Sequence, residues 1–461
     1  MKGRQDLGRT PIPRLVLGLA VPAMIAQFVN VLYSLIDRVY IGNIPEIGDL
    51  ALAGVGVCGP IVTLLSSFGT LVGLGGSILM AIRMGEGNNE AARRVLANCF
   101  LLLTGLSAVL TVGFLLCRRP LLLCFGASSA TFVYADTYMT IYTAGTFFAL
   151  MAVGLNYFIT CQGFSTVGMA AVLIGAVANI VLDPVFIFVL DMGVAGAAVA
   201  TVLAQFLSCC FTVWFLFRKP PIRIGFSRPD GRLMLWVATI GFPPFLIMAT
   251  DSLILIAMNA VLQRYGGPEQ GDLLIACATI VQSCMALITG PMLGISSGTQ
   301  AIISYNYGAC QSDRVRQATR CVLRMCLGFT AILFVVFQLM AGWVVRIFTA
   351  DPTLIDLSAW GLRVFTLAII PLAVQYARVD GLTALARTKT SLVLSLFRKG
   401  SFVVFTLILP IFWGAQAAFY AEPLADVISA CVSGTVFALV FEKHLRRREN
   451  QSRPTVQADE S

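Results

Sequence analysis

The chain of 461 residues is 58% hydrophobic and only 12% charged, with a mean hydropathy of +0.85. Soluble domains carry about 25% charged residues, so this composition excludes a soluble globular protein. The formal net charge of +9 could indicate a nucleic-acid partner, but the basic residues flank apolar segments, where they orient a protein in a membrane. We therefore expect a lipid bilayer as partner and no nucleic acid.

Apolar segments long enough to cross a bilayer, which takes about 20 residues, recur along the whole chain. The first follows a basic leader, but it is too long for a signal peptide and lacks a small-residue cleavage site, so we interpret it as a retained span. We predict twelve spans, at residues 15–38, 51–82, 95–117, 131–160, 166–190, 194–217, 232–262, 273–305, 320–345, 354–385, 391–412 and 416–441.

The basic residues predict the orientation of these spans. With the N-terminus inside, all but seven of the 32 Lys and Arg residues fall on the cytoplasmic side; the exceptions are Arg38, Arg118, Arg119, Arg264, Arg346, Arg363 and Arg378. Cytoplasmic loops carry such an excess of basic residues. We expect a multi-pass protein of the cytoplasmic (inner) membrane with both termini in the cytoplasm.

The two halves of the chain resemble one another. Pro22 matches Pro243 and Gly75 matches Gly298, at a nearly constant offset of 221 to 223 residues. Six spans in each half make the repeats parallel, with a cleft between them. We predict an N-lobe at residues 1–217, a cytoplasmic linker at 218–232 rich in proline and basic residues, a C-lobe at 233–442 and a cytoplasmic tail at 443–461.

Ionisable residues inside spans are costly and usually functional. Asp37 in the first span shares a helix face with Asn30 and Tyr33. The alternative is that Asp37 sits at the outer helix end and pairs with Arg38. On this reading Asp37 would have no part in transport.

A second polar group lies in the fifth and sixth spans. Asn179 and Asp183 are four residues apart on one helix face, and Thr201 could add a hydroxyl. We expect Pro184 to bias Asp183 away from the helical conformation; alternatively, Asp183-Pro184 simply ends a helix. Together with Asp37, these residues form a set of hard oxygen ligands that suits a proton or Na⁺.

The second half offers further candidates. Asp251 lies deep in its apolar segment and is aligned with Asn30 by the repeat. Glu422 and Asp426 could be functional, or could pair with Arg398 to hold helices together. Additional cleft-facing candidates for substrate binding are Gln282, Met285, Gln300 and Asn306, although such residues more often serve packing.

Other motifs argue against nucleotide or metal chemistry. Gly73, Gly75 and Gly76 are followed by no Lys-Ser/Thr pair, so we interpret them as sites of close helix packing rather than a phosphate loop. The 13 cysteines form no CxxC pair, and His444 is the single histidine. We expect no cofactor beyond H⁺ or Na⁺ as coupling ion.

Four segments carry a resemblance to a known family: VPAMIAQFVNVLYSLIDRVYIG, ILMAIRMGEGNNEAARRVLAN, ANIVLDPVFIFVLDMGVAGAAVAT and GTQAIISYNYGA. In this order they resemble the multidrug and toxin extrusion (MATE) family, in its MepA-like/DinF-like bacterial branch. The resemblance implies an all-α polytopic membrane protein with twelve transmembrane helices, in two pseudo-symmetric six-helix bundles that form a V-shaped central cleft. It also implies an ion site at Asp37, Asn179, Asp183 and Thr201.

These observations predict an antiporter that exports small organic cations in exchange for H⁺ or Na⁺ by alternating access, acting as a monomer. The main alternative is a flippase of lipid-linked sugars from the same superfamily, although the mostly acidic candidates favour cationic cargo. An integral-membrane enzyme would need a catalytic cluster that the spans do not show, and a channel fits the buried carboxylates less well than a gated carrier.

Overall fold

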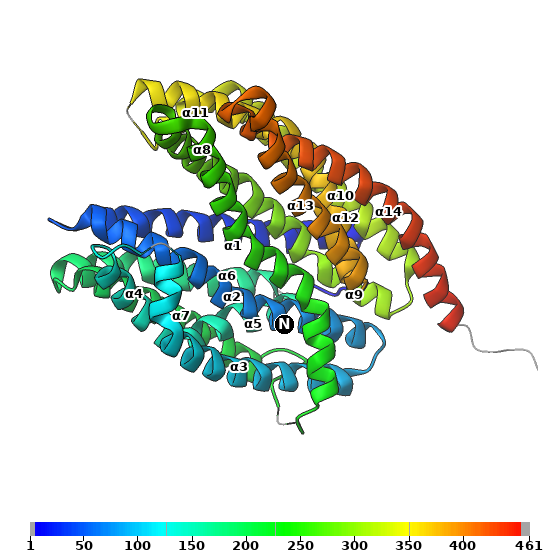
Figure 1. Ribbon diagram of the computed structural model, residues 1–461. Coiled ribbons are helices and arrows are strands. Elements are labelled where there is room, and N and C mark those ends of the chain that lie inside the picture. The colour runs from blue at the N-terminus through cyan, green and yellow to red at the C-terminus, as the bar shows by residue number, and fades with distance from the viewer. Residues whose placement is uncertain (1–4, 126, 226, 350, 453–461) are drawn as a thin grey trace, which may run out of the picture. The chain divides into compact units, whose positions relative to one another are not determined.

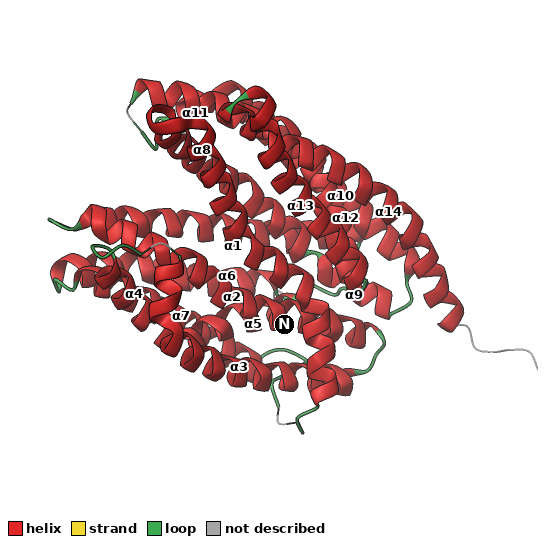
Figure 2. Ribbon diagram, viewed as in Figure 1, coloured by secondary structure: helices red, strands yellow, loops and turns green. Residues whose placement is uncertain are grey.

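The computed structural model describes residues 5–125, 127–225, 227–349 and 351–452. These residues form helices and turns and no strand (Figures 1 and 2). Residues 453–461 of the predicted tail lie outside the described residues.

The helices follow the predicted spans closely. In the first half they are α1 (Ile12–Gly42), α2 (Gly48–Gly85), α3 (Asn89–Cys124), α4 (Phe132–Ala144), α5 (Thr146–Thr160), α6 (Ser165–Pro184), the π-helical η1 (Val185–Val189) and α7 (Gly193–Arg218). In the second half they are α8 (Gly231–Gly298), α9 (Gln300–Gly308), α10 (Ser312–Val345), α11 (Pro352–Phe365), η2 (Thr366–Ala368), α12 (Ile369–Ala384), α13 (Thr388–Trp413), η3 (Ala415–Tyr420) and α14 (Ala421–Ser452).

Within the described residues, eleven helices are long and apolar enough to cross a membrane, and twelve if α4 and α5 are counted as one bent span. These two helices meet at an angle of 56° beside Gly145. A Cβ atom at Gly145 would lie 2.6 Å from a methyl group of Val202 on α7, so the bend brings the chain against α7 where only glycine fits. The predicted all-helical, multi-span fold is confirmed.

The long helix α8 (Gly231–Gly298) contains the seventh predicted span and most of the eighth. Its backbone is non-helical at Gly267, where φ is 65°, a conformation that glycine adopts without steric cost. The apolar spans on either side are Gly231–Asp251 and Leu273–Gly308. The kink therefore separates the seventh predicted span from the eighth.

The chain forms two compact units. The first holds residues 5–6 and Val21–Ala249, and the second holds Leu7–Ala20 and residues 250–452. The units differ from the predicted lobes in two places, because the start of α1 belongs to the second unit, whereas the linker and the start of α8 belong to the first.

Specific contacts explain why the linker belongs to the first unit. The Gln162 side-chain amide donates to the carbonyl of Ile222 at 3.1 Å and accepts from its N–H at 3.0 Å. The rings of Phe68 on α2 and Phe245 on α8 lie 4.7 Å apart. A Cβ atom at Gly241 would lie 1.8 Å from the carbonyl oxygen of Leu71, so α8 touches the backbone of α2.

The glycines of the GLGG segment pack helices of the first unit together. A Cβ atom at Gly73 would lie 2.6 Å from the Gly154 carbonyl oxygen on α5, and one at Gly75 would lie 2.2 Å from the Val237 carbonyl oxygen on α8. One at Gly76 would meet Cys99 Sγ on α3 at 2.5 Å. This confirms the predicted close helix packing, which small residues permit in membranes.

The second unit has its own apolar core. It is formed by buried residues from α8, α10, α11, α12, α13, η3 and α14, among them Met258, Leu262, Cys277, Leu362 and Phe419. Phe419 is fully buried, and its ring lies 5.6 Å from that of Phe365. This packing holds the helices that carry the charged residues of the second half.

Candidate functional site

The end of α6 places two of the predicted site residues. Asn179 and Asp183 are on one face of this helix and are 2% and 0% exposed. Pro184 is the last residue of α6, but the helical backbone continues beyond it into the π-helical η1, with φ −62° and ψ −30° at Pro184. Asp183 lies within α6, so the expectation that Pro184 would move it out of the helical conformation is wrong. Proline lacks an N–H, and the helix widens there instead of breaking; such π-helical turns are frequent at functional sites.

Asn179 connects α6 to α7. Its side-chain nitrogen donates to Asp183 Oδ1 at 3.1 Å and to Thr201 Oγ1 at 3.3 Å. Thr201 is 9% exposed and lies on α7. Both donors of the amide are thereby used to hold the carboxylate and the hydroxyl in place, and its oxygen is left to accept.

Asp37 of α1 completes the group. Its carboxyl group interacts directly with that of Asp183, and nearby the rings of Tyr40 and Phe188 meet at 6.4 Å. Among the described residues, neither Asp37 nor Asp183 forms an ion pair with a basic side chain. The alternative, in which Asp37 pairs with Arg38, is therefore not observed in the described part of the chain: Arg38 is exposed and forms no ion pair with Asp37.

Three oxygen atoms of this group have acceptor capacity left over. Asp37 Oδ1, Asn179 Oδ1 and Asp183 Oδ2 are buried, and accept no hydrogen bond from the described residues. A buried carboxylate without a partner is strongly disfavoured. An arrangement of two such carboxylates and an amide oxygen suits a bound proton or a small hard cation.

Two tyrosines, Tyr33 and Tyr138, lie close to these carboxylates, and Tyr142 lies near Tyr33; of the three we predicted only Tyr33. Tyr33 is within electrostatic range of Asp37 and Asp183, and Tyr138 interacts with Thr201. Tyr142 accepts from the Gln205 amide at 3.3 Å. Tyr138 and Tyr142 are four residues apart on α4, a helical spacing that could have indicated them in the sequence.

The remaining candidate of the first unit, Asn30, lies on α1 before Asp37 in the chain. Asn30 is partly exposed, and its amide donates weakly to Gln27 at 3.5 Å. Among the described residues, its hydrogen bond is to Gln27 and not to either carboxylate. It stays a predicted substrate-binding residue.

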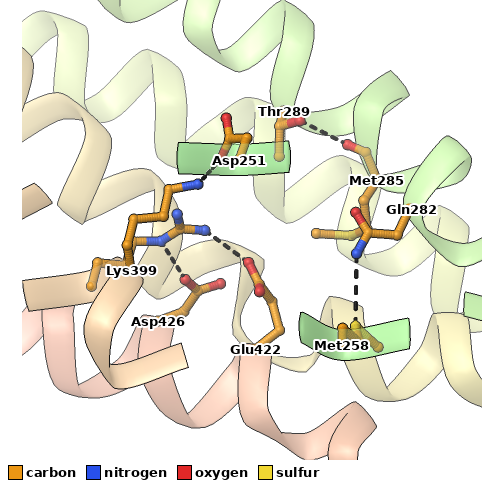
Figure 3. Close-up of polar contacts among 9 residues, drawn as sticks. Asp251, Met258, Gln282, Met285, Thr289, Lys399, Glu422 and Asp426 are labelled. Carbon is orange, nitrogen blue, oxygen red and sulfur yellow. Dashed lines mark hydrogen bonds and ion pairs between the residues drawn. The ribbon is translucent and has the colours of Figure 1, made fainter. Parts of the chain in front are cut away.

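Three predicted substrate-binding residues lie near one another in the second unit (Figure 3). Asp251 is paired with Lys399, and Gln282 donates to Met258 Sδ at 3.8 Å. Met285 is 7% exposed, and its carbonyl accepts from Thr289 at 3.0 Å. We did not predict Lys399 as part of this group.

Arg398 joins two helices beside Lys399. Its Nε donates to Asp426 Oδ1 and its Nη2 to Glu422 Oε1, both at 2.8 Å. These ion pairs connect α13 with α14, as one of the two alternatives for Glu422 and Asp426 expected.

Gln300 and Asn306 are almost fully enclosed, at 2% and 0% exposure. Asn306 donates to the carbonyl groups of Leu7 and Ile302 and accepts from Arg314 at 2.8 Å. Its hydrogen bonds hold the segment before α1 within the second unit. A substrate role for either residue stays a prediction.

Comparison with known proteins identifies the family. The profile of the MatE family matches residues 22–185 and again residues 243–408. The two matches begin 221 residues apart and end 223 residues apart, which confirms the predicted repeat and its offset.

Relatives and solved structures agree with this match. The chain is 22% identical over 421 residues to the multidrug export protein MepA of Staphylococcus haemolyticus, covering 90% of this chain and 91% of that protein. It is 26% identical over 410 residues to an FAD transporter of Shewanella oneidensis, covering 86% of this chain and 88% of that protein.

An outward-facing multidrug resistance MATE family transporter superposes with a TM-score of 0.90 at 23% identity, covering 97% of this chain and 99% of the other. A transporter of the MOP superfamily from Pyrococcus furiosus has a TM-score of 0.89 at 23% identity, covering 96% and 99%. The chain therefore belongs to the MatE family and is a multi-pass membrane transporter of the multidrug and toxin extrusion type.

Proposed function

We propose that this transporter is an ion-coupled antiporter that exports organic cations across the cytoplasmic membrane. The observation that carries the proposal is the group of three buried oxygens, on Asp37, Asn179 and Asp183, that accept no hydrogen bond from the described residues. Two of them belong to carboxylates that form no ion pair with a basic side chain among the described residues. Such a group gains most from binding a cation or a proton.

The geometry supports different roles for these four residues. Asp37 and Asp183 carry the negative charge, and Asn179 fixes Asp183 through the bond at 3.1 Å. Thr201 fixes the other side of the same amide at 3.3 Å. Loading of H⁺ or Na⁺ would remove the repulsion between the two carboxylates, so that helices α1 and α6 respond to the bound ion.

Alternating access follows from this response. A transporter exchanges two solutes when the conformation that favours one disfavours the other. Release of the coupling ion toward the cytoplasm restores the charge of the two carboxylates. Binding of substrate from the cytoplasm then favours the return of the transporter to the conformation that is open to the outside. The internal repeat agrees with a mechanism in which one half moves against the other.

The proposal includes organic cations as the transported substrate and the cytoplasmic membrane as the location of the protein. The relative from S. haemolyticus is named a multidrug export protein, and the ion-coupling candidates are acidic, both of which support organic cations as cargo. We propose the cytoplasmic membrane with both termini inside, because this orientation would place most of the basic residues in the cytoplasm, and we propose function as a monomer. A flippase of lipid-linked sugars is the competing function.

The experiment is transport in proteoliposomes. The purified protein is reconstituted, and uptake of ethidium is followed under an imposed pH gradient or Na⁺ gradient. FAD release is followed in parallel, because one relative is named an FAD transporter. The variants Asp37→Asn and Asp183→Asn are compared with the unaltered protein.

Ethidium movement driven by one gradient and lost in both variants would support the antiporter and identify its ion. Folded protein that moves no cation under either gradient would overturn the proposal. Scrambling of a lipid-linked sugar by such protein would then favour the flippase.

A further inference from the structure

The second unit contains a pair of opposite charges that the ion site does not use. Asp251 on α8 is paired with Lys399 on α13, and their side chains are 50% and 17% exposed. Ionised side chains in spans rarely face lipid and almost always face the protein interior or a water-filled pathway. The half-exposed Asp251 carboxylate is therefore accessible to a solute rather than to lipid.

Lys399 is held in place by its neighbour in the chain. Arg398 binds Asp426 and Glu422 on α14, each at 2.8 Å, and its own side chain is 11% exposed. Successive residues on a helix point about 100° apart, so anchoring Arg398 toward α14 directs Lys399 toward α8. Figure 3 shows Lys399 reaching Asp251 from one side, with Thr289, Met285 and Gln282 on the other.

The group also has acceptor capacity to spare. Asp426 is fully buried, and its Oδ2 accepts no hydrogen bond from the described residues. Figure 3 shows its carboxyl group beside Lys399 and Glu422. Three carboxylates thus face two basic side chains, and Gln282 and Met285 supply an amide and a flexible apolar surface next to them.

We infer that the Asp251–Lys399 pair is a substrate subsite selective for zwitterions, molecules that carry a cationic and an anionic group together. A simple cation that binds Asp251 must draw it away from Lys399, whose ammonium then loses the ion pair that it forms among the described residues. A zwitterion pairs its cation with Asp251 and its anion with Lys399, so both charges keep a partner. This inference deepens the proposed cation export, on which it rests, by naming the substrate class.

The test uses two dyes that differ in one group. Rhodamine 123 and rhodamine 110 share a cationic ring system with amino groups, but rhodamine 110 has a free carboxylate where rhodamine 123 has a methyl ester. Binding to the purified full-length protein is measured by fluorescence anisotropy, and uptake is measured in proteoliposomes. We expect rhodamine 110 to bind about tenfold more tightly, the effect of one additional ion pair of about 1.4 kcal/mol.

Variants at Lys399 decide the reason for the preference. Lys399→Gln removes the cation and should abolish the preference for rhodamine 110, whereas Lys399→Arg keeps the cation and should retain it. Lys389→Gln, at an exposed lysine near the start of the same helix, is the matched control and should behave like the unaltered protein.

Equal affinities for the two dyes in the unaltered protein, or a preference that survives Lys399→Gln, would overturn the inference. Uptake reports the proposed function separately. Gradient-driven uptake of both dyes with equal affinities overturns only the zwitterion subsite, and preferential binding without gradient-driven uptake of either dye overturns only the antiport.

Discussion

Replacing Asp183 by Asn tests the ion site most directly. The change keeps the size of the side chain and an oxygen for the bond from Asn179, but it removes one of the two carboxylates that have no basic partner among the described residues. Each ion exchanged per cycle transmits its own gradient to the cargo. A gradient of one pH unit is worth about 1.4 kcal/mol per proton, which is a tenfold accumulation of a monovalent cation.

This arithmetic predicts the size of the defect. Loss of one exchangeable ion removes a factor of about ten from the steady-state accumulation, whether the ion is H⁺ or Na⁺ in a tenfold gradient. We expect Asp183→Asn to lower ethidium accumulation at least tenfold. The assay is dye accumulation in proteoliposomes, with the membrane potential held at zero by K⁺ and valinomycin so that only the chemical gradient acts.

The matched control is Asp136→Asn in the same unit. Asp136 is partly exposed and pairs with Arg118 at 2.8 Å, and an exposed pair of this kind contributes about 0–1 kcal/mol. This variant should accumulate dye like the unaltered protein. Accumulation by Asp183→Asn at the level of the unaltered protein would refute the assignment of Asp183 to ion coupling.

Three further changes test the packing of the helices that carry the ion site and the Asp251–Lys399 pair. Gly241→Leu should abolish folding, because even a Cβ atom would lie 1.8 Å from the Leu71 carbonyl oxygen; size-exclusion chromatography of the detergent-purified protein measures this. Arg398→Gln should destabilise the protein by about 3–5 kcal/mol, because it leaves buried carboxylates without their cation, as measured by chemical unfolding. Gln162→Ala should expose the linker to trypsin, because the backbone of Ile222 loses bonds at 3.0 and 3.1 Å that are worth about 1 kcal/mol each.

Each of these changes has a control in the chain. Gly113→Leu, on α3, places the side chain in open space and should leave the protein folded. Arg324→Gln and Gln317→Ala alter exposed side chains of α10 and should leave unfolding and proteolysis unchanged. A folded Gly241→Leu protein, an unaltered stability of Arg398→Gln, or an intact linker in Gln162→Ala would each contradict the corresponding packing argument.

The sequence by itself determined the class, the spans and the repeat of this protein. Hydropathy sufficed because a bilayer requires long apolar helices that satisfy their own backbone hydrogen bonds, and this requirement is met locally, span by span. The spacing of four between Asn179 and Asp183 placed them on one helix face for the same reason. The bond from Asn179 to Asp183 at 3.1 Å follows from that local geometry.

Other features depended on contacts between residues far apart in the chain. Lys399 is opposite Asp251, 148 residues away in sequence, because Arg398 is anchored on α14, and no local pattern indicates that pairing. Likewise, Tyr138 of α4 comes close to Asp37 of α1 and to Thr201 of α7, a proximity that depends on how these helices pack. The expectation for Pro184 is wrong because the π-helical turn that follows it overrides its local preference. Local periodicity thus decides which residues share a helix face, whereas only tertiary packing decides which faces meet and which buried charges are paired.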